Sequence, residues 1–174
     1  MGDIALTGLG LCFPVLMMVT AFAMLIGSGG APRAAIYMGK GDNETAERIL
    51  GNSVTSLIVI SVVLTIFLEA VAEPILWMFG ASEKTLPFAL GYMRIYVAGS
   101  IFVMMTLGLN MFITTQGFAK ISMKTVLIGA ICNIILDPLF IFAFHMGVKG
   151  AAVATILSQA VSAVWVFSFL NGKQ

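Results

Sequence analysis

Long apolar stretches, separated by short charged segments, are the dominant pattern of this sequence. Crossing the hydrocarbon core of a bilayer takes about 20 apolar residues in a helix, within a range of about 17–25. Five stretches reach that length, and none has the short alternating segments of a membrane β-barrel. They predict an all-α integral membrane protein, a bundle of five transmembrane helices at approximately 4–38, 43–78, 87–117, 120–145 and 149–171.

The composition excludes a soluble domain. Of 174 residues, 60% are hydrophobic and 10% are charged, and the mean hydropathy is +1.06. Soluble domains carry about 25% charged residues. The net charge of +1 comes without a basic cluster, so nothing indicates nucleic-acid binding. Cys12 and Cys132 are expected to be small core residues, and a single histidine, His145, makes a histidine-based metal site implausible.

The charges also predict an orientation in the cytoplasmic (inner) membrane. Short loops make consecutive helices antiparallel, so the loops alternate between the two ends of the bundle. Basic residues favour one end by six to three: Arg33, Lys40, Arg48, Lys120, Lys124 and Lys173 against Lys84, Arg94 and Lys149. The positive-inside rule places the first end in the cytoplasm, with the N-terminus of the chain outside and its C-terminus in the cytoplasm. An odd number of helices starting outside leads us to expect a further helix upstream.

A polar group interrupts the fourth stretch. Within segment 125–144 the only charge is Asp137, and Asn133 precedes it by four residues, which places both side chains on one helix face. Pro138 has no N–H, so the carbonyl of Ile134 loses its usual helical donor. A carboxylate at membrane depth costs about 2.5–3.5 kcal/mol on insertion scales. These oxygens predict a site for Na⁺ or a proton; a purely structural carboxylate paired with Asn133 is the alternative.

The last hairpin offers one more ligand. At 1.5 Å per residue, Asp137 lies roughly 12 Å and Thr155 roughly 8 Å from the turn at 145–150, close enough in depth for the two to face each other. Small residues at 150–154 let the two helices approach closely. Thr155 is therefore a candidate ligand, although a threonine that bonds to its own preceding turn gives the same pattern.

Three other segments carry polar signals with more than one interpretation. Gly27–Gly30, followed by Pro32, predicts a weak helix end, either a hinge or a loop boundary. The polar positions from Asn110 to Gln116 predict either hydrogen bonds between helices or the lining of a cavity. Segment 39–48 predicts a glycine turn with Asp42 or Asn43 capping the next helix.

That last segment has two enzyme-like interpretations, and both fail. It lacks the Gly-Lys-Ser/Thr order of a phosphate-binding loop. It also spells the Gly-x-Gly-Asp pattern of intramembrane aspartyl proteases, whose chemistry needs two neighbouring carboxylates. Asp42 is expected in a cytoplasmic loop and Asp137 near the exterior, so the two do not meet. We expect no enzyme.

An ordered series of motifs across all five helices resembles the multidrug and toxic compound extrusion (MATE) transporters, especially the prokaryotic DinF-like and MepA-like branch. The most specific are Asn133-Ile-Ile-Leu-Asp-Pro-Leu-Phe-Ile141 and Gly147-Val-Lys-Gly-Ala-Ala-Val-Ala-Thr155 through Ser158-Gln159. The others are Gly27-Ser-Gly-Gly30 to Gly39-Lys-Gly-Asp42, Pro74-Ile-Leu to Phe79-Gly-Ala81, Leu90-Gly-Tyr-Met-Arg-Ile95, Leu109-Asn110 and Gln116-Gly117.

The resemblance implies a twelve-helix fold of two lobes, of which this chain matches helices two to six of the N-terminal lobe. It implies an antiporter that exports drugs or other organic cationic and amphipathic compounds against Na⁺ or H⁺, with no further cofactor. The cation site implied for this lobe falls on Asp137, Asn133 and Thr155, with Tyr92 and Gln159 as possible members of its network. A first helix with a second aspartate, and the C-terminal lobe, are the implied partners, together with the lipid bilayer.

Two alternatives to export stay open. A flippase for lipid-linked precursors shares the two-lobe fold and predicts a more basic central cavity, for which Arg94 is the one candidate inside these helices. A non-transporting remnant is the other. The apolar cavities of such transporters do not reveal their substrate from sequence.

Overall fold

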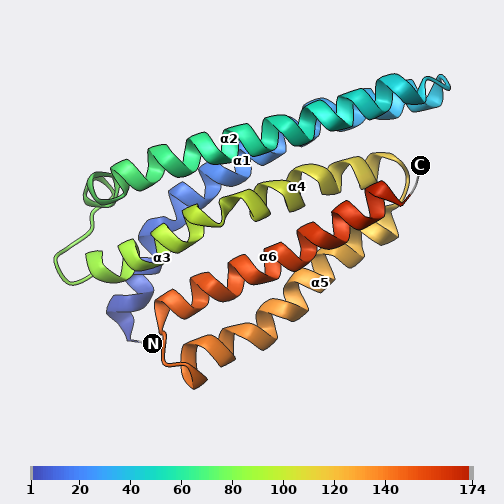
Figure 1. Ribbon diagram of the computed structural model, residues 1–174. Helices are drawn as coiled ribbons and strands as arrows, with labels where there is room; N and C mark the ends of the chain where they lie inside the picture. The colour runs from blue at the N-terminus through green and yellow to red at the C-terminus, as the bar shows by residue number, and fades with distance from the viewer. Residues whose placement is uncertain (1, 173–174) are drawn as a thin grey trace.

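The computed structural model describes residues 2–172 as a bundle of helices (Figure 1). No strand occurs among these residues, which confirms the all-α class. The helices are α1 (Asp3–Gly39), α2 (Asn43–Met78), α3 (Leu86–Ala98), α4 (Ser100–Thr115), α5 (Ala119–Pro138) and α6 (Val148–Asn171), with a π-helical turn, η1 (Leu139–Ala143), between the last two.

The apolar runs become spans of sufficient length. Helices α1, α2, α6 and the continuous unit of α5 with η1 are each long and apolar enough to cross a membrane. The pair α3 and α4, bent by 55°, passes the same test when taken together, as a broken span or a re-entrant loop. The described residues thus hold four candidate spans, or five if that pair crosses as one, which agrees with a multi-pass membrane protein.

The bend corrects one expectation, because 87–117 was expected as one uninterrupted helix. The break falls at Gly99, between α3 and α4. A Cβ atom at this position would collide with the side chain of Ile156 on α6. The missing side chain at Gly99 thus lets α6 pack directly against the backbone of the bend.

Helix α4 lies in the middle of the bundle, between the α1–α2 pair and the α5–α6 pair (Figure 1). Its side chains Met104, Leu109, Phe112 and Ile113 are at most 1% exposed and form the centre of the core. The turns at 40–42 and 116–118 lie at one end of the bundle with the C-terminal part of α6, and the α2–α3 and α5–α6 turns lie at the other (Figure 1). We call these the α1–α2 end and the α2–α3 end.

The glycine motif in α1 does not end the helix, contrary to one expectation. Helix α1 continues through Gly27, Gly30 and Pro32 to Gly39. A Cβ on Gly27 would lie 2.8 Å from the backbone oxygen of Gly108 on α4. These glycines permit close approach of α1 to α4, which is how small residues act in membrane helix packing.

Candidate cation-binding site

Asn133 and Asp137 meet on one face of α5, as their spacing predicts. The Nδ2 of Asn133 donates a hydrogen bond of 3.0 Å to Oδ2 of Asp137. The Oδ1 atoms of both residues are buried and have no hydrogen-bond donor within residues 2–172. The pair therefore presents two acceptor oxygens whose partner lies outside the described chain, as a bound cation, water or another segment.

Pro138 marks a change of helical geometry directly after this pair. The α-helical hydrogen bonds of α5 end there, and the chain continues in the wider π-helical turn to Ala143. Because proline has no N–H, the carbonyl of Ile134 receives no helical bond from position 138. Single π-turns often occur at functional sites. The carbonyl of Ile134, about one turn before Asp137, thus lacks its α-helical donor.

The hydroxyl hydrogen of Thr155 is used within α6. Its Oγ1 donates to the carbonyl of Ala151 at 3.0 Å, which is the local alternative noted for the sequence. The oxygen keeps its lone pairs, and Thr155 lines the same cavity as Asn133.

A Cβ on Gly150 would lie 2.7 Å from the carbonyl oxygen of Phe140, so this glycine lets the two helices of the α5–α6 hairpin pack closely.

Tyr92 comes from α3 and is 7% exposed. Its phenol lies close to the side chain of Thr155 on α6. The Tyr96 ring stacks on it, with the ring centroids 6.1 Å apart. Three helices, α3, α5 and α6, therefore bring Tyr92, Asn133, Asp137 and Thr155 to one region.

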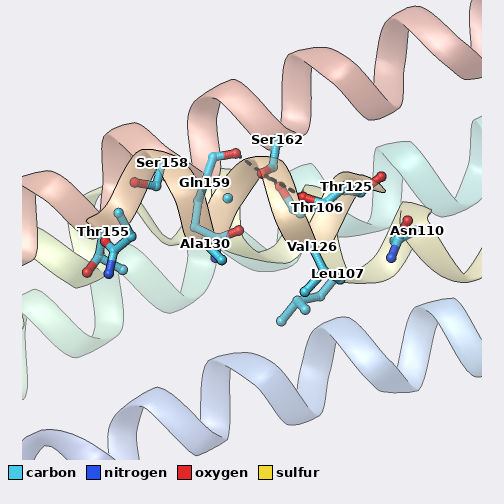
Figure 2. Close-up of a pocket in the computed structure, with 12 residues that line it drawn as sticks. Thr106, Leu107, Asn110, Thr125, Val126, Ala130, Thr155, Ser158, Gln159 and Ser162 are labelled. Atoms are coloured by element: carbon cyan, nitrogen blue, oxygen red, sulfur yellow. Dashed lines mark hydrogen bonds between the residues drawn. The ribbon is translucent and has the colours of Figure 1, made fainter. Parts of the chain in front are cut away.

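A polar cavity of about 290 Å³ runs between α4, α5 and α6. Figure 2 shows its lining residues in a row from Thr155 at one end to Asn110 at the other. Asn133, Thr155 and Gln159 all line it, whereas Asp137 and Tyr92 are not part of the lining. Eight of the twelve lining residues are polar, and none is ionisable: Thr106, Asn110, Thr125, Asn133, Thr155, Ser158, Gln159 and Ser162, with Leu107, Val126, Gly129 and Ala130.

Several of these polar residues bond to backbone carbonyls of neighbouring helices. Thr106 Oγ1 donates to the carbonyl of Gln159 at 3.1 Å, and Ser162 Oγ donates to the carbonyl of Thr125 at 3.3 Å (Figure 2). Asn110 Nδ2 donates to the carbonyl of Ser122 at 3.4 Å. Asn110 Oδ1 and Gln159 Oε1 are buried without a donor inside residues 2–172. For Asn110, both interpretations of the sequence hold: it links two helices and lines the cavity.

The sequence reasoning had not singled out Thr106, Thr125 or Ser162. Thr106 and Ser162 have apolar neighbours on both sides and Thr125 follows Lys124, and a hydroxyl in a helix commonly bonds to its own preceding turn. Only the packing of three helices brings them together. The sequence signal that could have indicated this cavity is a polar residue on each of the three helices at the same depth in the membrane.

Arg94 does not contribute to the cavity. Its side chain is 55% exposed, and its Nε lies 3.9 Å from Oε2 of Glu69. It is absent from the lining of the polar cavity. The lining of the polar cavity thus contains no basic residue among residues 2–172.

The outward side of α5 is largely uncovered. Among its residues only Thr125 is buried. Ile131, Ile134 and Ile135 are 55%, 71% and 62% exposed. An apolar helix face in this position meets either lipid or further protein.

Comparison with known proteins identifies the family. The family model described as MatE matches residues 1–139. The multidrug export protein MepA of Staphylococcus haemolyticus (strain JCSC1435) is 27% identical over 168 residues, covering 97% of this chain and 37% of that protein. The FAD transporter of Shewanella oneidensis (strain ATCC 700550 / JCM 31522 / CIP 106686 / LMG 19005 / NCIMB 14063 / MR-1) is 28% identical over 167 residues, covering 93% of this chain and 37% of that protein.

The fold agrees with this match. The solved structure described as MATE in the bent conformation superposes with a TM-score of 0.94 at 29% identity, covering 99% of this chain and 39% of that one. This chain thus spans a little over a third of the length of these relatives, which are transporters rather than enzymes. With 139 of its 174 residues matched by the family model, the chain belongs to the MATE family of membrane transporters.

Proposed function

We propose that this chain acts within a longer MATE transporter, as helices two to six of its N-terminal lobe. The transporter exports drugs or other organic cationic and amphipathic compounds across the cytoplasmic membrane in exchange for Na⁺ or H⁺. The observation that carries the proposal is the Asn133–Asp137 pair, whose two buried acceptor oxygens have no donor inside residues 2–172.

The chemistry of that pair suits ion coupling. A carboxylate within the membrane-spanning bundle is costly unless a cation or proton accompanies it. Na⁺ binds to one anionic and two neutral oxygens here: Asp137 Oδ1, Asn133 Oδ1 and the hydroxyl oxygen of Thr155. A proton binds to the carboxylate alone. The two ions compete for one carboxylate, so loading one releases the other.

The polar cavity next to this pair supports the export of organic compounds. Its hydroxyl and amide lining offers hydrogen bonds without a fixed charge, beside apolar positions such as Leu107 and Val126. The relatives named above are a multidrug export protein and an FAD transporter, so their names alone do not give one substrate class. An uncharged lining favours compounds recognised by shape and hydrogen bonds rather than by charge.

Two observations support missing partners within the same transporter. The relatives are more than twice as long as this chain. The uncovered apolar face of α5 lies beside the acceptor oxygens that lack a donor. We assign that face to the first helix of the N-terminal lobe and the remaining length to a C-terminal lobe, with this segment starting outside and ending in the cytoplasm.

The test is a substitution in the full-length product of the gene that encodes this chain. In proteoliposomes, Asp137→Asn should lower dye efflux driven by a Na⁺ or H⁺ gradient at least about tenfold, while membrane expression stays intact. The control is Glu73→Gln, an exposed carboxylate near the same end of the bundle. Undiminished efflux in Asp137→Asn contradicts the assignment of the coupling site.

A further inference from the structure

A second cleft, of about 400 Å³, opens at the α1–α2 end of the bundle between α1, α2, α4 and α6. It shares no lining residue with the polar cavity beside Asn133. Its volume falls within the range of about 300–1,000 Å³ of sites for small molecules. It is therefore a separate candidate site, at the end that the basic residues predict to be cytoplasmic.

One face of α2 forms a wall of this cleft. The lining residues on this helix are spaced one, three or four positions apart, as on a single helix face. They include Asn43, Glu47, Leu50, Gly51 and Val54. The wall begins with polar groups in the first turn of α2 and becomes apolar deeper in the bundle. The cleft is thus amphipathic along its length.

The two acidic residues at the start of α2 have different roles. Glu44 lies on another face and pairs with Arg48, with Glu44 Oε1 and Arg48 Nη2 2.6 Å apart. Glu47 lines the cleft and has no ion pair or hydrogen bond with any residue of 2–172. One carboxylate is paired within its own helix, while the other is exposed at the cleft without such a partner.

The other walls are apolar with an amide rim. Leu109 and Phe112 of α4, at most 1% exposed, lie at the buried base of the cleft, and the half-buried Phe167 and Leu170 of α6 form another wall. Asn171, at the end of α6, and Gln116, after α4, add amide groups at the open end. An aromatic surface next to a lone carboxylate complements a cation that carries an apolar ring system.

Gly51 shows that space is present in this wall. A Cβ atom at this position would meet no atom within 4 Å. Other helical glycines, such as Gly27 and Gly108, instead have atoms of a neighbouring helix within 3 Å of the same point. A larger side chain at Gly51 therefore fills the cleft without displacing a helix.

We propose that this second cleft binds aromatic organic cations, with the positive charge against Glu47 and the rings over the apolar surface at Leu50 and Phe167. The lining of the polar cavity has no ionisable group, so Glu47 supplies the charge selection that the cavity lacks. The inference rests on the proposed export function, in which the cleft takes up cations before they reach the cavity. A carboxylate here disfavours anionic lipid headgroups as the occupant.

The experiment uses ethidium as the probe and a cysteine at the rim as a local reporter. In the full-length product with Cys12, Cys132 and any other native cysteine replaced by Ala, Asn171→Cys supplies one thiol beside the cleft. Its alkylation by a maleimide is timed in detergent and in lipid nanodiscs. Ethidium should slow alkylation of this thiol at least about fivefold, and phenanthridine, its uncharged ring system, should slow it far less.

Matched variants assign that protection to the cleft. Glu47→Gln should remove the protection by ethidium, and Glu44→Gln should keep it, because Glu44 pairs with Arg48 away from the cleft. Gly51→Leu should also remove it, and Gly10→Leu should keep it, since Gly10 is exposed and a Cβ there meets no atom within 4 Å. Protection that survives both Glu47→Gln and Gly51→Leu overturns the proposal.

The outcome separates this inference from the proposed function. Asp137→Asn should lose coupled efflux and keep ethidium protection at the cleft. Intact efflux without protection of the rim thiol overturns the cleft and leaves the coupling site. Protection without any effect of Asp137→Asn on efflux overturns the coupling site and leaves the cleft. A thiol shielded in nanodiscs but not in detergent, before ethidium is added, identifies lipid as the occupant and overturns the cation proposal.

Discussion

Asn133 and Asp137 are joined by one hydrogen bond of 3.0 Å, which uses Nδ2 of the amide and Oδ2 of the carboxylate. Both Oδ1 atoms stay buried without a donor within residues 2–172. The amide thus orients the carboxylate while leaving both residues an oxygen for a ligand. A buried acceptor without a partner costs about 1–3 kcal/mol, and neither oxygen finds a donor within residues 2–172.

Replacing Asn133 by leucine should weaken cation binding. The change removes one neutral oxygen and the donor that holds Asp137, and hydrogen bonds to charged groups contribute about 1.5–3 kcal/mol. The cation concentration for half-maximal efflux should therefore rise about 10- to 100-fold. Ile134→Leu, at a 71% exposed position next to it, is the control and should match the wild type. An unchanged cation dependence in Asn133→Leu shows that Asp137 is held by something else.

Thr155 tests whether a hydroxyl that bonds to its own helix also serves the site. Its hydrogen goes to Ala151, and its oxygen lies near Tyr92 and the Asn133 end of the cavity. Thr155→Val keeps the shape and removes the oxygen, so it should raise the half-maximal cation concentration about tenfold. Thr155→Ser should stay close to wild type, and Tyr92→Phe should shift in the same direction as Thr155→Val. If Thr155→Val behaves like the wild type, the hydroxyl only supports its own turn.

The fold and the core of the site follow from local patterns, whereas the cavity does not. Apolar runs bounded by charges predict spans, and Asn133 and Asp137 meet because both lie on one turn of one helix. The bend at Gly99 has no such signal, since it depends on Ile156 arriving from α6. The row formed by Thr106, Thr125 and Ser162 likewise needs three packed helices, and each residue alone resembles an ordinary helical hydroxyl.

The glycines of α1 show how one residue type carries two meanings. Gly27–Gly30 with Pro32 has the composition of a helix end, and flexibility was the expectation. In the bundle, Gly27 faces the backbone of α4 at a distance that leaves no room for a side chain. Sequence composition does not distinguish a glycine that provides backbone flexibility from one that allows close helix packing, because the packing is visible only with the partner helix in place.

Gly27→Ala should destabilise the bundle. Its Cβ would lie 2.8 Å from Gly108 O and 2.9 Å from Met111 Sδ, and α4 has to shift to accept it. Overpacking of this kind costs about 1–3 kcal/mol, so the detergent-solubilised protein should unfold at a lower temperature. Gly29→Ala is the matched control, because a Cβ there meets no atom within 4 Å. Equal melting temperatures for the two variants contradict a tight α1–α4 contact.

Asp42 provides a pH-dependent test at the start of α2. The side chain of Thr45 and its backbone N–H, the latter 3.0 Å from Asp42 Oδ1, both donate to the Asp42 carboxylate and hold its pKa below the ordinary value of 3.8. A pKa that is lower in the folded state means that the cap stabilises the first turn fully above about pH 3.8. The stabilisation is lost as the pH falls through the lower folded-state pKa.

Hydrogen exchange at the Thr45 amide should follow that sign. After correction for intrinsic rates, its protection should be constant from about pH 7 to about pH 5 and should fall only below about pH 3.8, where the cap becomes protonated. Asp42→Ala should lower the protection at every pH, because no side-chain acceptor remains. Asp42→Ser should keep the cap and remove the acid dependence, since a hydroxyl does not titrate in this range. Protection in Asp42→Ala equal to wild type means that the first turn of α2 is held by packing of the helix, and the cap is then incidental.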